Sequence, residues 1–238
     1  MLILELKKTK FLNLLLASII IPLLANIFGL INYLNNIEIL RFEWKSLWTQ
    51  VTLFYFSFFF IPLIAIVVAS LWSVEHKTNL KLIRISPIKN ISFIISKGIL
   101  SLLIIALTQM YFLLLFYLEG KFICHFSDTD FGIYIYYISL SIVLSIPMIF
   151  VFQFLAIKIK SLGIIVLLST FTSILGFALT TQNIFTLLAK VMGLNYLSLE
   201  LNNGRFINTQ TLTLLFAFAI VEIIVFSYLA NKSLKYEK

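Results

Sequence analysis

One polar stretch of the sequence, residues 73–97, carries charged side chains at a spacing suited to contact with another protein. Its three central cations recur at i, i+4 and i+7, on one face of a helix, and they are Lys77, Lys81 and Arg84. Glu75 near the start and Arg84 near the end both suit the helix dipole, and Pro87 disfavours continuation of the helix. The stretch therefore predicts a short amphipathic helix over 75–85. Such a helix could dock in a groove of a soluble partner, or it could be a connector that faces lipid.

A second candidate is Glu222, the single acidic side chain deep inside the last apolar run. A charged group at the centre of a bilayer costs roughly 2.5–3.5 kcal/mol on insertion scales. We interpret Glu222, together with Asn26 and Gln153, as polar contacts along a translocation path. The alternative is a hydrogen bond between helices, with Asn13, Asn26 or Gln153 as the partner of the carboxyl group.

The sequence lacks the patterns of common hydrolytic enzymes. It has no glycine-rich phosphate loop with a lysine, so we expect that this chain does not hydrolyse ATP itself. Its two histidines, His76 and His125, are predicted on opposite sides of the membrane and cannot share a metal ion. We expect no catalytic residue, metal or cofactor in this chain. Two other classes stay open at this point, an intramembrane enzyme and a membrane subunit without transport activity.

Six long apolar runs position these residues. The chain has 238 residues, of which 61% are hydrophobic and only 12% are charged. Runs of about 20 apolar residues match the thickness of a hydrocarbon core, and strands of a membrane barrel would be half as long and would alternate with polar residues. The sequence predicts an all-α protein with six transmembrane helices, at 11–34, 49–71, 98–118, 134–156, 162–180 and 211–229.

The lysines and arginines are unevenly distributed between the segments that connect these runs. If both termini lie on the inner side, the inner segments carry 13 of the 18 basic residues. The positive-inside rule then places both termini in the cytoplasm. The net charge of +8 is explained by this topology and by contact with anionic membrane lipids. No segment resembles a nucleic-acid-binding module.

The remaining segments complete a single transmembrane domain over 1–238. Residues 1–10 mix leucines with lysines and are predicted to form an interfacial helix. Trp44 and Trp48 are expected in an outer loop, anchored at the headgroup level. The apolar piece at 184–194 is too short to span and predicts a re-entrant helix before the last span.

The stretch at 73–97 resembles the cytoplasmic loop of type-2 ABC exporter permeases. In that family a glutamate opens the loop, a helical piece and a proline follow, and a lysine begins the third span about ten residues later. The residues that match are Glu75, Pro87 and Lys97. The pair Glu75 and His76, with Asn79 three residues later, is closer to the lantibiotic-immunity branch, although Leu80 stands where that branch usually has an aromatic residue.

This resemblance implies a set of partners and an activity. Two permeases, either identical or related, would pair with two cytoplasmic ATPase subunits that bind ATP and Mg. The implied coupling helix contacts the ATPase through Glu75, His76, Lys77, Asn79, Leu80, Lys81, Ile83, Arg84 and Pro87. The implied activity is export of amphipathic or cationic peptides across the plasma membrane of a bacterium, as self-immunity against a lantibiotic or another bacteriocin. The alternative is export of the cell's own cytolytic or signalling peptides.

Overall fold

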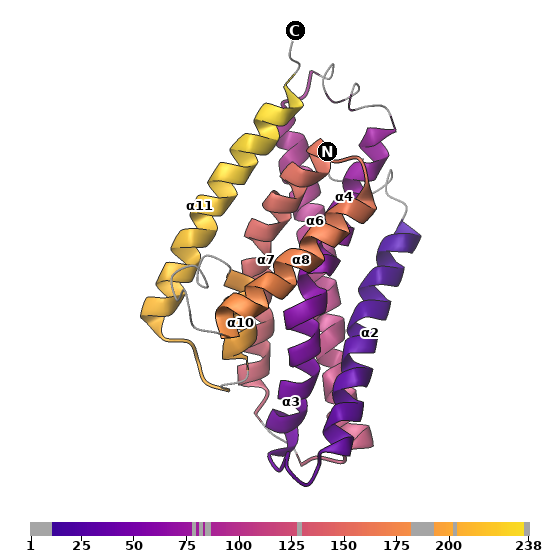
Figure 1. Cartoon of the computed structure of the whole chain (residues 1–238), viewed down its shortest axis with the longest axis vertical. Helices are drawn as coiled ribbons and strands as arrows, with labels where there is room; N and C mark the ends of the chain where they lie inside the picture. The colour runs from indigo at the N-terminus through magenta and orange to yellow at the C-terminus, as the bar shows by residue number, and fades with distance from the viewer. Residues whose placement is uncertain are drawn as a thin grey trace.

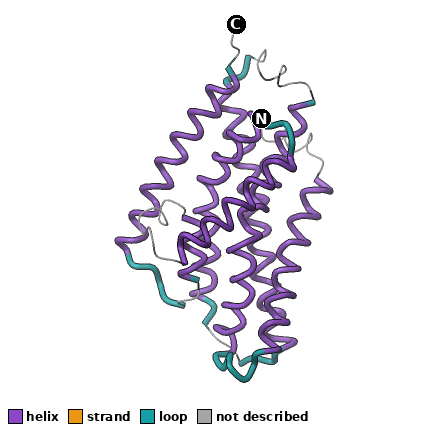
Figure 2. The backbone as a smooth tube through the Cα atoms, in the orientation of Figure 1, coloured by secondary structure: helices purple, strands orange, loops and turns teal. Residues whose placement is uncertain are grey.

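The structure is a computed structural model that describes residues 11–77, 80, 83, 87–127, 130–181, 193–201 and 204–235. These residues form helices and connecting turns, and no strand occurs among them, as the tube in Figure 2 shows. The helical elements in chain order are α2 (Phe11–Asn35), α3 (Glu43–Phe54), η1 (Tyr55–Phe59), α4 (Phe60–His76), α6 (Asn90–Leu118), η2 (Glu119–Ile123), α7 (Gly132–Lys158), α8 (Leu162–Thr181), α10 (Gly193–Glu200) and α11 (Thr209–Leu234).

Six helical stretches of the described chain are long and apolar enough to cross a membrane, which confirms the predicted fold class. The second and third are much longer than expected. The second runs without a break through α3, η1 and α4, from Glu43 to His76, and the third runs from Asn90 to Ile123. Both helices extend through additional turns with polar residues at their ends, and a search for apolar runs cannot detect these turns. The interfacial helix predicted over 1–10 lies outside the described residues, and so does most of the piece predicted at 184–194.

The six spans form an elongated bundle whose centre is α4 (Figure 1). Helix α4 packs on α7 and α8, whereas α11 lies at the edge, packs mainly on α7 and turns most of its surface outward. The described start of α2 and the end of α11 lie at the same end of the bundle (Figure 1). The short helix α10 lies near the other end, against α8 and α7.

The second span contains a widened turn, the π-helical segment η1. Pro62 follows it, and a proline lacks the N–H that would bond to the carbonyl four residues earlier and also clashes with that carbonyl. The carbonyl in question belongs to Phe58, inside η1, so the wider turn avoids this clash. A carbonyl of the same turn finds a partner in another helix, because the Ser173 hydroxyl of α8 donates to Ser57 O at 2.7 Å.

The two tryptophans expected as interfacial anchors are buried instead. Trp44 and Trp48 belong to α3, with exposed fractions of 4% and 1%. Trp48 packs against Phe116 and Tyr134, with ring centroids 5.0 and 4.9 Å apart. The anchor interpretation was therefore wrong, because helix α3 begins at Glu43 and turns both indoles toward α6 and α7.

Helices α2 and α3 approach each other at Gly29. A Cβ atom placed on Gly29 would lie 2.5 Å from Val51 Cα and 2.6 Å from Val51 N. Small residues allow such backbone contact between membrane helices, where dispersion rather than the hydrophobic effect drives association. Gly29 thus sets the distance between the first span and the second.

Candidate functional site

A buried ion pair joins the last turn of α4 to the first part of α6, at the two ends of the stretch 73–97. The Lys97 ammonium lies 3.3 Å from Glu75 Oε1 and donates a second hydrogen bond to Leu71 O at 2.9 Å. Both residues are almost fully buried, with exposed fractions of 3% for Glu75 and 1% for Lys97. The ammonium also lies 5.3 Å from the centre of the Trp72 ring, within the range of a cation–π contact. The two ends of the connection between α4 and α6, residues 77–89, are thereby fixed to each other.

His76, the last residue of α4, links the same end of the bundle to α7. Its Nε2 atom is hydrogen-bonded to the carbonyl oxygen of Ala156, two residues before the end of α7. A carbonyl only accepts, so the bond requires a proton on Nε2. Three helices, α4, α6 and α7, are thus connected by polar side chains at one end.

The helix predicted over 75–85 does not begin at Glu75. Glu75 and His76 form the last turn of α4, Lys77 is in a turn, and Leu80 has a left-handed φ of 59°. The Leu80 N–H bonds to Glu75 O at 3.1 Å, which closes the end of α4. The dipole argument that put Glu75 at a helix start was therefore wrong, because its carboxylate is held by Lys97 at the end of the preceding helix.

The other predicted contact residues divide into two groups. Leu80 and Ile83 are buried, with exposed fractions of 5% and 1%, and they attach the connection to the bundle. Lys77 and Pro87 are exposed at its two ends. Three predicted residues fall outside the described part of the chain, and they are Asn79, Lys81 and Arg84.

The three residues assigned to a translocation path lie on three different helices, α2, α7 and α11. Asn26 is fully buried and donates to Pro22 O of its own helix at 2.9 Å. Gln153 is also fully buried, and its amide has no hydrogen-bond partner among the described residues. Glu222 is half-buried and adjoins a cavity of about 10 Å³ between α7, α10 and α11, lined also by Pro147 and Leu194. This space is about the size of one water molecule.

Sequence reasoning missed the role of Lys97 as the partner of Glu75. Twenty-two residues separate the two positions, and Lys97 looked like a residue that begins a span. A signal was present, because a lysine directly next to an apolar run needs a counter-charge or access to the interface. The nearest acidic residue before it in the sequence is Glu75.

Comparison with known protein families gives a match that covers most of the chain. A family model described as ABC-2 family transporter protein matches residues 1–176 of the 238. The matched range includes the ion pair, the connection between α4 and α6, and the first four spans. Among curated proteins and among solved structures, no match is found.

Proposed function

The chain belongs to the ABC-2 family of transporter proteins, and we propose from this premise that it is the permease of a bacterial exporter that expels amphipathic or cationic peptides. As a member of that family it is a multi-pass membrane protein and the transport subunit of an ABC transporter, which operates with a separate ATPase subunit. In our proposal two permeases, identical or related, pair with two ATPases that bind ATP and Mg.

The observation that carries this proposal is the pair of Glu75 and Lys97. Mechanical coupling requires an element that contacts the ATPase and is held rigidly by the membrane helices. The ion pair fixes both ends of the connection, and Leu80 and Ile83 attach its middle to the bundle. Lys77 and Pro87 are exposed at the end of the bundle that the positive-inside rule assigns to the cytoplasm, where an ATPase could contact them.

Peptide export as self-immunity is supported by the resemblance of Glu75, His76 and Asn79 to the lantibiotic-immunity branch. Such substrates partition into the membrane, and a permease with a largely lipid-facing last span is accessible from the bilayer. Two acidic side chains on the outer side, Glu119 and Glu200, are poorly placed to attract a cationic peptide. Glu119 is 7% exposed, and the Glu200 carboxylate accepts a hydrogen bond from Tyr196 at 2.9 Å.

Charge reversal at the exposed start of the connection tests the coupling contact. We expect Lys77→Glu to lower peptide transport per ATP hydrolysed by about tenfold, since a loss of about 1.4 kcal/mol of contact free energy corresponds to that factor. The measurement uses proteoliposomes that contain the permease and its ATPase. Lys158→Glu is the matched control, because Lys158 is exposed at the same end of the bundle outside the connection. Equal transport by both variants would remove the coupling assignment.

Deletion of the gene tests the substrate. We expect the deleted strain to become sensitive to an amphipathic bacteriocin, with normal secretion of its own peptides, and to regain resistance when the wild-type gene is restored. Minimum inhibitory concentrations and the peptide content of the medium are the two readouts. Unchanged sensitivity together with lost secretion would replace self-immunity by export of the cell's own peptides.

A further inference from the structure

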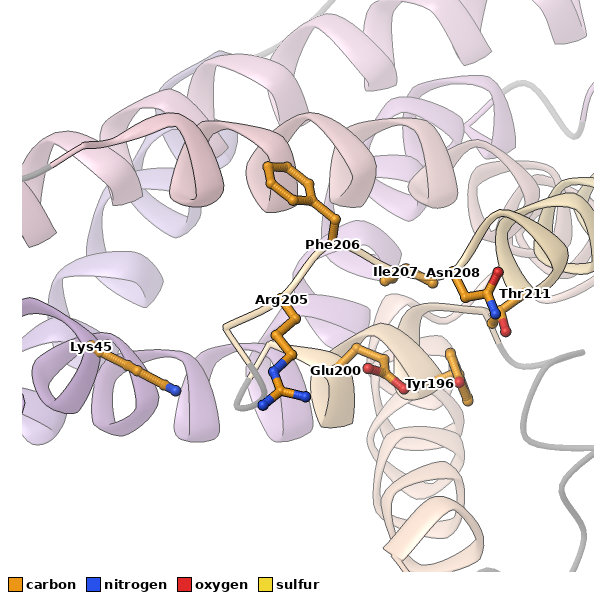
Figure 3. Close-up of a pocket in the computed structure, with 8 residues that line it drawn as sticks. All are labelled: Lys45, Tyr196, Glu200, Arg205, Phe206, Ile207, Asn208 and Thr211. Carbon is orange, nitrogen blue, oxygen red and sulfur yellow. Dashed lines mark hydrogen bonds between the residues drawn. The ribbon is translucent and has the colours of Figure 1, made fainter.

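A hollow of about 610 Å³ lies at the end of the bundle opposite to Glu75, where α3, α10 and the start of α11 meet (Figure 3). Its volume falls within the range typical of small-molecule sites. The lining residues are Lys45, Tyr196, Glu200, Arg205, Phe206, Ile207, Asn208 and Thr211. Neither the proposed coupling contact nor the predicted translocation path includes any of them.

The wall of this outer pocket is held in place by two tyrosines. The Tyr137 hydroxyl of α7 lies 2.8 Å from Glu200 O and 2.6 Å from Arg205 O, so it ties both ends of the turn at 200–205 to the bundle. The Tyr196 hydroxyl donates to Glu200 Oε1. Burial and the neighbouring Glu200 carboxylate raise the pKa of Tyr196 to about 12, so this donor stays protonated at neutral pH. The backbone of Arg205 is therefore held in place before any ligand binds.

Two cationic side chains converge in the pocket. Figure 3 shows the nitrogen ends of Lys45 and Arg205 directed toward the same space. Lys45 lies against the backbone next to Arg205, because a Cβ atom placed on Gly204 would be 3.4 Å from Lys45 Nζ. Within the described part of the chain, neither charged group forms an ion pair. Like charges that line one pocket repel, and an anion between them would lower that repulsion.

The rim of the pocket is apolar on the side of the last span. Phe206 is 69% exposed and packs edge-to-face on Tyr136, with ring centroids 5.0 Å apart. Helix α11 begins three residues later, and its outward face carries exposed side chains such as Leu214 and Ile220. A cationic pocket at the end of a span thus continues into a surface suited to hydrocarbon chains.

We propose that the outer pocket binds an anionic phospholipid, with its phosphate between Lys45 and Arg205 and an acyl chain along Phe206 and α11. The depth of the pocket, at the start of a membrane span, is the depth at which lipid headgroups occur. A lipid is favoured over a free anion because the pocket opens onto the apolar face. This assignment is independent of the peptide-export proposal.

The test measures lipid binding by the purified full-length chain in detergent, using native mass spectrometry with phosphatidylglycerol. We expect Arg205→Gln and Lys45→Gln each to weaken binding by about tenfold, or about 1.4 kcal/mol, because each loses a charge-assisted hydrogen bond to the phosphate. Arg41→Gln is the matched control, an exposed arginine at the same end that does not line the pocket. Its binding should change less than twofold. Size-exclusion profiles identical to wild type show that each variant is folded.

Three outcomes would overturn the assignment. Equal weakening by Arg41→Gln would make the attraction a general surface effect. Equal binding of phosphatidylcholine and phosphatidylglycerol, unaffected by Arg205→Gln, would exclude an anion site. The third outcome is that the wild-type protein binds glycerol phosphate, or a peptide with a free carboxyl terminus, instead of the lipid, and that Arg205→Gln abolishes this binding. Lys45 and Arg205 would then serve another ligand. No readout here needs ATP or transport, so failure of the export proposal would leave the result unchanged.

Discussion

Glu75→Ala is expected to destabilise the permease by about 3–5 kcal/mol, the typical cost of removing one partner from a buried ion pair. The Lys97 ammonium would stay at a position that is 1% exposed, with Leu71 O as its remaining described acceptor. The expected observation is a large fall in the temperature at which the protein, purified in detergent, loses its monodisperse elution peak. Glu75→Gln keeps a hydrogen-bond acceptor for Lys97 and should therefore lose less stability than Glu75→Ala.

Two further variants separate the ion pair from general effects. Lys77→Ala removes an exposed charge two residues away and should leave the transition temperature within experimental error of wild type. Glu75→Ala combined with Lys97→Met removes both charges and should recover most of the loss, because no unpaired charge remains buried. A double variant as unstable as Glu75→Ala would mean that shape, and not charge, makes this position sensitive.

Gly29→Leu is expected to prevent α2 from packing on α3 and to abolish recovery of monodisperse protein. Extra carbons in a well-packed interior cost about 1–3 kcal/mol when neighbours can move, and occasionally more. At Gly29 the obstacle includes backbone, since a Cβ would lie 2.5 Å from Val51 Cα. The helices themselves would have to separate, and the contacts of Val51 with α2 would be lost.

The matched control for this change is Gly163→Leu at the start of α8. There a Cβ would have Ser161 Oγ as its nearest neighbour, 3.8 Å away, and the residue is exposed. This variant should be recovered like wild type. Val51→Ala should fail to rescue Gly29→Leu, because it removes the side-chain contact and leaves the two backbone contacts. A full rescue would place the obstacle in the Val51 side chain alone.

The sequence was sufficient for the number and class of the spans, because runs of apolar residues follow directly from the thickness of the bilayer. It was insufficient for the ends of the spans. Glu75 and Lys97 are charged residues within helices, and their burial depends on partners in other helices. The role of Trp48 was missed for the same reason, since an indole suits both the headgroup region and an aromatic interior.

Site residues were predictable in type but not in placement. The stretch at 73–97 contains the buried ion pair, yet Glu75 and His76, which were expected to start a new helix, form the last turn of α4. Nothing in the sequence indicated the outer pocket. Lys45 and Arg205 are 160 positions apart, and only the fold brings them to one space.

The widened turn η1 has a geometric consequence for the second span. One extra residue in a helical turn rotates everything beyond it by about 100°, the angle between successive residues of an α-helix. The stripe of α3 that faces α2 at Val51 and the stripes of α4 that face α7 and α8 are therefore out of phase with one another. The π-helical turn at Tyr55–Phe59 therefore sets which faces of α4 meet α7 and α8 relative to the face of α3 that meets α2.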